Sequence, residues 1–145
     1  MITIGRKDKI DLPEFQLYDI DVKVDTGAYG SALHCHSTKI VLRDGVETLA
    51  FKILDPDHPE YEGQVYYTTK FNQKRVKSSN GELEHRYTIK TTMVLFGKVK
   101  VIEFSLTDRS NMKNPILLGR KFLSGKFLVD VKLKNLSFQK KNNIS

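Results

Sequence analysis

An acidic residue stands at the end of an alternating apolar run, and its neighbours suit it to proton-transfer chemistry. The run Val22–Val24 leads directly into Asp25-Thr26-Gly27-Ala28. A carboxylate at this point can act as a general acid or base toward water. Thr26 can brace the turn with its hydroxyl, and Gly27 permits a close backbone approach that a side chain would block. The same residues also fit an ordinary turn after a strand, so a catalytic role depends on a second motif.

That second motif is Ile116-Leu117-Leu118-Gly119-Arg120. Together the two motifs resemble the half-site of a retropepsin-type aspartic peptidase, in which the second segment passes beside the catalytic turn and leads into a short helix. The resemblance implies that Asp25, Thr26 and Gly27 are catalytic and that Ala28 and Ser31 bind substrate. Such peptidases use two carboxylates that share one proton. The chain has one Asp-Thr-Gly, so the resemblance implies a homodimer.

Further segments narrow the resemblance and extend it from about Gly5 to Asp130. They are Ser31–His34, Arg75–Gly81, Glu84–Arg86, Asn111–Met112 and Phe127–Asp130. With them the chain resembles a bacterial retropepsin-like family labelled "ATP-dependent zinc protease", which is linked to ATP-grasp glutamate ligases. The resemblance implies a glutamate-rich or glutamylated protein substrate and a functional link to such a ligase. The sequence contains neither a phosphate-binding Gly-rich loop nor a helix with a paired-His zinc motif, so neither part of the label is supported by a motif.

Charge is distributed unevenly along the chain. Residues 1–69 carry 7 basic and 12 acidic side chains, residues 70–119 carry 10 and 4, and residues 120–145 carry 7 and 1. A basic second half favours an acidic partner. Nucleic acid is the generic candidate, and an acidic peptide is the one that the resemblance implies. A solvated basic face without any partner is the alternative.

The elements that position these residues are predicted to be β-strands, because apolar residues recur with period two. The fold class expected is all-β, and the resemblance implies a retropepsin-like closed barrel with one short C-terminal helix, Arg120–Ser124. Hairpin turns are expected at Asp44-Gly45, Ser79–Gly81 and Gly97-Lys98. Residues 1–138 are predicted to form one domain, and residues 139–145 a disordered tail. The expected strands are 15–20, 21–24, 31–36, 38–42, 48–54, 65–71, 74–78, 84–93, 94–96, 99–106, 127–131 and 136–138.

The hairpin around Ser78-Ser79-Asn80-Gly81 lies between the two motifs. Retropepsins place a mobile flap there, which closes over substrate, so residues 74–90 are predicted to be a flap. An ordinary surface hairpin with a polar tip is the alternative. As a flap, the hairpin would carry positive charge over the cleft. Its expected substrate-binding residues are Arg75, Ser78, Ser79, Gly81 and Arg86, with Lys77 and His85 adding to the charge.

Arg120 has two interpretations. In retroviral relatives the corresponding Arg pairs with an Asp just beyond the catalytic turn and steadies the dimer. This chain has Tyr29 at that position, which argues against that ion pair. Arg120 is therefore expected to bind a substrate carboxylate, which its planar fork suits, or to pair with another acid structurally.

The run His34-Cys35-His36 suggests a zinc site as a further alternative. On a strand, His34 and His36 would share one face, and Cys35 would point the other way into the core. Two His without an obvious third ligand make a weak case. We therefore predict no metal site and no cofactor.

The composition fits a small globular protein, with 39% hydrophobic and 28% charged residues. No apolar stretch is long enough to cross a membrane, and Met1–Asp8 lacks a signal-peptide core. Cys35 is the single cysteine, which favours the cytoplasm. The resulting prediction is an aspartic-type peptidase. The alternatives are a glutamyl-bond hydrolase that uses Asp25 without a symmetric pair, and a noncatalytic peptide- or nucleic-acid-binding module.

Overall fold

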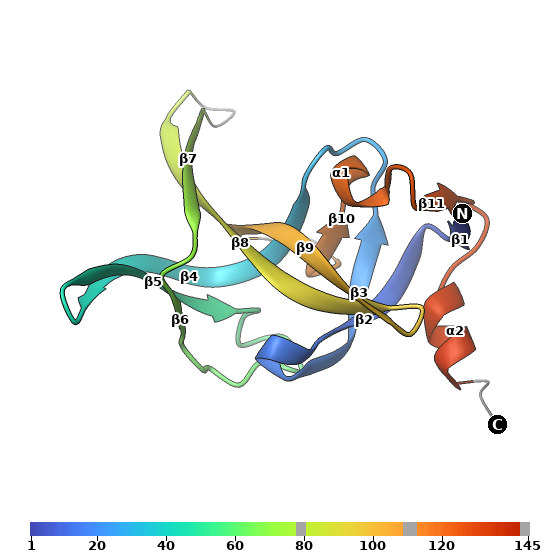
Figure 1. Cartoon of the computed structure of the whole chain (residues 1–145), viewed down its shortest axis with the longest axis horizontal. Coiled ribbons are helices and arrows are strands. Elements are labelled where there is room, and N and C mark those ends of the chain that lie inside the picture. The colour runs from blue at the N-terminus through green and yellow to red at the C-terminus, as the bar shows by residue number, and fades with distance from the viewer. Residues whose placement is uncertain (78–80, 109–112, 143–145) are drawn as a thin grey trace.

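A closed barrel of six strands forms the centre of the computed structural model (Figure 1), which describes residues 1–77, 81–108 and 113–142. Around the barrel each strand pairs with the next, and the last, β10, pairs with both β3 and β4. The predicted all-β closed barrel is therefore confirmed. In order around the barrel, the strands are β3 (Leu17–Val24), β2 (Lys7–Leu12), β8 (Leu83–Leu95), β9 (Lys98–Thr107), β4 (Ser31–Arg43) and β10 (Ile116–Leu118).

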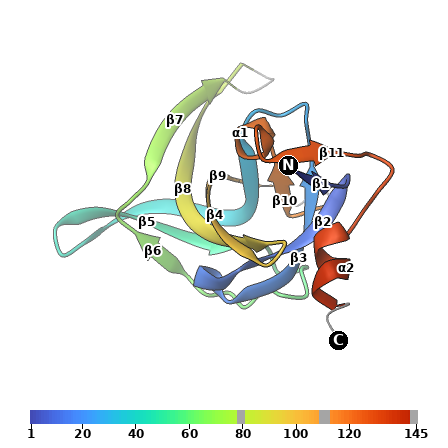
Figure 2. The same cartoon turned by 45° about the vertical axis from the view of Figure 1, so that its right-hand side comes forward.

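Other strands extend or flank the barrel. The long ends of β4 and β8 leave it and continue into two arms, one with β5 and one with β7 (Figures 1 and 2). A separate two-stranded parallel sheet joins the start of the chain to residues after the second motif. These elements are β5 (Val46–Ile53), β6 (Tyr66–Thr68), β7 (Asn72–Lys77), β1 (Ile2–Ile4) and β11 (Phe127–Val129).

Alternation along the strands fills the barrel. On β9, Ile102 and Phe104 are buried while Val101 is exposed, as the period-two pattern requires. In β10, the strand of the second motif, Ile116 and Leu118 are fully buried on either side of Leu117. Burying each such side chain is worth roughly 1.5–3 kcal/mol, so the strand that adjoins the Asp25 turn is anchored in the core.

Two hairpins turn through pairs of residues with positive φ. The angles are 52° and 75° at Asp44-Gly45, and 53° and 71° at Phe96-Gly97, which is the pattern of a two-residue type I′ turn. The first turn is where the sequence predicts it. The second is one residue earlier than predicted, because Lys98 already belongs to β9.

The strand predicted at residues 136–138 is wrong, because Leu136–Asn142 forms the helix α2. A strand would bury Leu136 and Phe138, whereas the buried residue is Ser137. The carboxylate of Asp8 accepts the main-chain N–H groups of Ser137 at 2.9 Å and Phe138 at 3.1 Å. These N–H groups belong to the first turn of the helix, where N–H groups have no hydrogen-bond acceptor within the helix itself. A contact with β2 thus decides between helix and strand.

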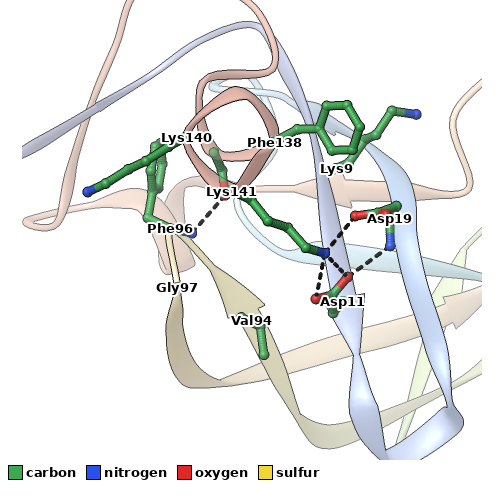
Figure 3. Close-up of a pocket in the computed structure, with 10 residues that line it drawn as sticks. Lys9, Asp11, Asp19, Val94, Phe96, Gly97, Phe138, Lys140 and Lys141 are labelled. Carbon is green, nitrogen blue, oxygen red and sulfur yellow. Dashed lines mark hydrogen bonds and ion pairs between the residues drawn. The ribbon is translucent and has the colours of Figure 1, made fainter. Parts of the chain in front are cut away.

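The end of α2 is held as well, so the tail predicted to begin at residue 139 is helical up to Asn142. Lys141 Nζ lies 2.9 Å from Asp19 Oδ1 and 3.3 Å from Asp11 Oδ2 (Figure 3). These carboxylates raise the pKa of Lys141, chiefly through the hydrogen bond to Asp19. Residues 143–145 of the predicted tail lie outside the described residues.

Replacing Asp8 by Ala should lower the free energy of unfolding by about 2 kcal/mol, since two N–H groups at the start of α2, one buried and one partly buried, lose their acceptor. Urea denaturation measures the change. Asp21→Ala is the matched control, because Asp21 makes an exposed ion pair with Lys9, worth at most about 1 kcal/mol. Equal losses in the two variants would contradict an anchoring role for Asp8.

Several smaller differences concern strand limits. Expected strands 31–36 and 38–42 are one strand, β4, and 84–93 and 94–96 are one strand, β8. The strands β1, β2 and β10 are not among the expected strands. In β2 the buried acid Asp8 interrupts an otherwise apolar inward row. The predicted strand 65–71 shortens to Tyr66–Thr68, since Thr68 Oγ1 accepts the N–H of Lys70 and bends the chain. The pair 15–20 and 21–24 is one strand, β3. Within the described residues, no helix has the length and apolarity needed to span a bilayer.

Candidate active site

The end of β3 is positioned by β10, which lies between two strands that come from the first half of the chain. β10 runs parallel to β3, with Leu118 opposite Val24, and antiparallel to β4. The N–H of Asp25 donates to the carbonyl of Leu118 at 2.9 Å. The two sequence motifs therefore meet in the structure, and the second one holds the backbone of Asp25 directly.

The turn itself orients the Asp25 carboxylate. Its Oδ1 accepts the N–H of Gly27 at 2.9 Å, and its carbonyl accepts the N–H of Ala28 at 3.3 Å. The residue is half-buried. Among the described residues, no group hydrogen-bonds to Oδ2. One carboxylate oxygen is thus fixed by the turn while the other is left for water, substrate or a second carboxylate.

A backbone crossing beyond the turn explains why Gly119 belongs to the second motif. The N–H groups of Arg120 and Lys121 donate to the carbonyls of Ala28 and Tyr29, each at 2.8 Å. A Cβ on Gly119 would lie 2.6 Å from the Tyr29 carbonyl oxygen and closer still to that of the next residue. Only glycine allows these two segments to approach so closely. Gly119 was not among the predicted site residues, although its place in the motif is the signal that could have revealed it.

Ser31, expected to bind substrate, takes part in the same crossing. It is 5% exposed, and its hydroxyl accepts the N–H of Gly119 at 3.0 Å. This contact gives Ser31 a structural role in tying β4 to the second motif. Its contact with substrate stays a prediction.

Arg120 turns back onto the catalytic turn. Its guanidinium donates to the carbonyl of Thr26 at 2.9 Å and lies 5.9 Å from the centre of the Tyr29 ring. The partner is therefore a main-chain oxygen and an aromatic face rather than the acid that a structural pair would require. Arg120 is exposed, so its predicted contact with a substrate carboxylate stays open.

The predicted flap region is a hairpin that stands away from the barrel (Figure 2). Strand β7 pairs with β8 in a register that places Arg75 opposite His85 and Lys74 opposite Arg86. Both arginines are exposed, and Gly81 has a φ of 86°. Ser78 and Ser79 lie outside the described residues. The antiparallel pairing of β7 with β8 is confirmed, and the role of this pair as a flap over substrate stays a prediction.

Comparison with known proteins identifies the family of this chain. The sequence model described as "Retropepsin-like aspartic endopeptidase RimB" matches residues 3–140. The chain belongs to this RimB-like family. The resemblance to retropepsin-like proteins is thereby confirmed.

Curated relatives of this RimB-like chain carry a different name. Proteins of Shewanella halifaxensis and Shewanella pealeana, each named "Probable alpha-L-glutamate ligase", are 31% identical to it over 131 residues. A protein of the same name from Parasynechococcus marenigrum is 31% identical over 133 residues. The two Shewanella matches cover 88% of this chain but only 28% of each relative. The RimB-like chain thus corresponds to a minor part of these larger proteins.

A solved structure supports the fold. The crystal structure of a Legionella pneumophila protein with unknown function superposes on the RimB-like chain with a TM-score of 0.73. The superposition covers 94% of this chain and 98% of the other, at 23% sequence identity. It shows that the two chains share their architecture.

The alternation predicted for His34-Cys35-His36 is wrong in this RimB-like chain. A register shift between Cys35 and Ser37 interrupts the strand, so His34 and Cys35 are both buried while His36 is exposed. His34 Nε2 lies 2.6 Å from Asp55 Oδ2, and the ring of His36 packs against that of Tyr61. In the described part of the chain, no three His, Cys, Asp or Glu side chains form a group that could hold a metal ion.

The contact with His34 also affects Asp55. Its pKa lies below the ordinary value, first because the N–H of Asp57 donates to its carboxylate and second because of His34. A carboxyl group whose pKa falls on folding stabilises the folded state above its ordinary pKa and loses that contribution as the pH drops through the lowered value. The contact therefore helps to hold residues after β5 against β4 at neutral pH and is lost in acid.

Cys35 should be chemically inert in the folded protein. Burial raises the pKa of its thiol to about 11, and the thiol donates to the carbonyl of Lys52 at 2.9 Å. The thiolate is the reactive form, so labelling by an aromatic disulfide reagent near neutral pH should be slow when native and rapid in guanidinium. The denatured chain, with the same single thiol, is the control. Equally fast labelling in both states would contradict this environment.

Proposed function

We propose that this RimB-like protein hydrolyses peptide bonds by an aspartic mechanism, as a homodimer in which each protomer contributes Asp25. The observation that carries the proposal is the turn geometry. Gly27 holds one oxygen of the Asp25 carboxylate, and the other has no partner among the described residues. A carboxylate fixed in this way can exchange a proton with a bound water, provided that a second acidic group stands opposite.

The chemistry follows from the pairing of two carboxyl groups. Held close together they cannot both ionise, so the pair carries a single proton at working pH. The ionised member takes a proton from water as the water oxygen attacks the peptide carbonyl carbon, while the protonated member donates to the carbonyl oxygen. Return of a proton to the amide nitrogen then breaks the C–N bond and releases the amine.

The homodimer is needed because the chain contains one Asp-Thr-Gly, and a two-fold axis is the simplest way to bring two copies together. Arg120 already uses its guanidinium on the Thr26 carbonyl of its own protomer. With Tyr29 in place of an acid, an Arg–Asp ion pair cannot steady the dimer. We therefore expect a weak dimer that dissociates on dilution.

Sedimentation tests this expectation. A monomer–dimer equilibrium should appear in the micromolar range, and the specific activity should fall as the protein is diluted through it. A strictly monomeric species with full activity would refute the shared pair and favour a glutamyl-bond hydrolase that uses Asp25 alone.

The proposed substrate is a glutamate-rich or glutamylated protein. The relatives named as glutamate ligases contain a segment similar to this chain within a longer protein, and a hydrolase associated with such a ligase would act on the bonds that the ligase makes. The net charge of the chain is +7, which favours an acidic substrate through long-range attraction. A functional link to a glutamate ligase follows from the same reasoning.

A matched pair of peptides tests the substrate. One contains a run of glutamates and the other has glutamine at the same positions. We expect the glutamate peptide to be cleaved faster, and its advantage to shrink as salt rises, because screening weakens the attraction. Equal rates at low and high salt would remove glutamate recognition while leaving the Asp25 mechanism intact.

A further inference from the structure

A cavity of about 360 Å³ opens beside the Asp25 turn. Its floor is the outer face of β8 and β9, where Lys90 lies opposite Glu103, and one wall is α1 (Arg120–Leu123). Tyr29, in the loop that follows the catalytic turn, lines the opening, and its carbonyl accepts the N–H of Lys121. The cavity is therefore continuous with the backbone that positions Asp25.

Lysines dominate the lining. Lys74, Lys90, Lys121 and Lys126 come from four separate elements or loops, and Glu103 is the acid among them. Lys121 Nζ lies 3.3 Å from Glu103 Oε1, so the charge of Lys121 is balanced by that of Glu103. Together these residues form what we call the lysine cavity.

The other three lysines of the cavity form no ion pair among the described residues. Lys126 Nζ lies 5.1 Å from the centre of the Phe122 ring. Within the described part of the chain, the side chains of Lys74 and Lys90 make neither an ion pair nor a hydrogen bond, although Lys90 stands opposite Glu103 on the neighbouring strand. Two lysines near α2 differ, since Lys9 pairs with Asp21 and Lys141 with two aspartates. Like charges grouped around one hollow raise its positive potential and favour an anionic occupant.

We propose that the lysine cavity binds side-chain carboxylates of an acidic peptide segment next to the bond that Asp25 cleaves. The inference rests on the proposed function, because it assigns a recognition site to the same substrate. Each ammonium group offers up to three N–H donors to a carboxylate oxygen, and such charge-assisted bonds are among the strongest that a surface can make.

The lining favours a peptide over nucleic acid. Proteins that bind single strands use exposed aromatic rings on which bases stack. In this cavity the Phe122 ring is 5% exposed, which leaves Tyr29 as the exposed ring among the lining residues. The volume is also that of a small-ligand pocket, which range from about 300 to 1,000 Å³. It suits a few side chains rather than a duplex.

Binding of fluorescein-labelled hexaglutamate, followed by anisotropy, tests the proposal. It is measured on the Asp25→Asn variant, so that no hydrolysis can occur. Joint replacement Lys74→Gln, Lys90→Gln and Lys126→Gln should weaken binding at least about tenfold, since three charge-assisted contacts are lost. The matched control, Lys39→Gln, Lys98→Gln and Lys132→Gln, removes the same charge from exposed positions outside the cavity. It should change the affinity less than about twofold.

Three results would overturn the lysine cavity as a peptide site. They are equal weakening by the two triple variants, absence of hexaglutamate binding, and tighter binding of an RNA oligonucleotide of equal charge with the same lysine dependence. Hexaglutamate bound by Asp25→Asn but not cleaved within longer peptides by the wild type would support the cavity and refute the hydrolase. If the triple variant of the lysine cavity cleaves the glutamate peptide with the kcat/KM of the wild type, the cavity alone is refuted.

Discussion

The Asp25→Asn protein should lose peptide hydrolysis by roughly 10²–10⁴-fold or more, which is the contribution expected of a general acid–base group. In the wild type, the N–H of Gly27 donates to Asp25 Oδ1 at 2.9 Å. The asparagine amide is nearly isosteric, and its oxygen can still accept this hydrogen bond. It cannot take a proton from water. Loss of the reaction with retention of the fold is therefore the signature of the proposed chemistry. Rates on a cleavable peptide and thermal unfolding of the same samples measure both.

Asp21→Asn is the control for Asp25→Asn. Asp21 is on β3, the strand that leads into the catalytic turn, its side chain is 54% exposed, and it pairs with Lys9 at the surface. Surface pairs of this kind contribute at most about 1 kcal/mol, so activity and stability should both stay close to wild type. Wild-type hydrolysis by Asp25→Asn would refute the aspartic mechanism. Activity abolished by a chelator and restored by zinc would likewise contradict the aspartic mechanism.

Gly119→Ala should be strongly destabilising. The added methyl group meets the backbone carbonyls of Tyr29 and Gly30, and backbone atoms cannot swing aside as a flexible side chain can. Overpacking typically costs 1–3 kcal/mol, and we expect a loss of about 3 kcal/mol at a crossing of two backbones. The hydrogen bonds from Arg120 and Lys121 to the catalytic loop should be displaced at the same time, so activity should fall with stability.

Gly30→Ala provides the matched comparison for this crossing. A Cβ on Gly30 meets no atom within 4 Å, so its unfolding free energy should lie within about 0.5 kcal/mol of wild type. Urea denaturation of both variants, together with peptide hydrolysis, separates the effects. A Gly119→Ala protein that is as stable and active as Gly30→Ala would show that the two segments separate easily and that their contact does not hold Asp25.

Local sequence patterns determined those features of this protein that depend on neighbouring residues in the chain, namely the burial of side chains along a strand and the backbone angles of a turn. Alternation along Lys98–Thr107 gives one buried and one exposed face because a strand places successive side chains on opposite sides. Asp44-Gly45 forms a hairpin turn because these residues tolerate positive φ. Asp25-Thr26-Gly27 is likewise a short motif, and its turn is held by local hydrogen bonds from the N–H groups of Gly27 and Ala28 to Asp25.

The tertiary structure decided the features that depend on residues distant in sequence. Leu136–Phe138 could be a strand or a helix, and Asp8 from the other end of the chain makes it a helix by accepting its first N–H groups. The register shift after Cys35 arises from pairing with β5, and it buries His34 beside Asp55.

The lysine cavity belongs with these distant effects. Its lysines are separated in the sequence by up to 52 residues, from Lys74 to Lys126, and in the sequence they are indistinguishable from the other basic residues of a solvated face. Closure of the barrel brings β7, β8 and α1 around one hollow beside the catalytic turn. A periodic pattern predicts which way each side chain points on its own strand. Which strands and helices become neighbours follows from packing the whole core.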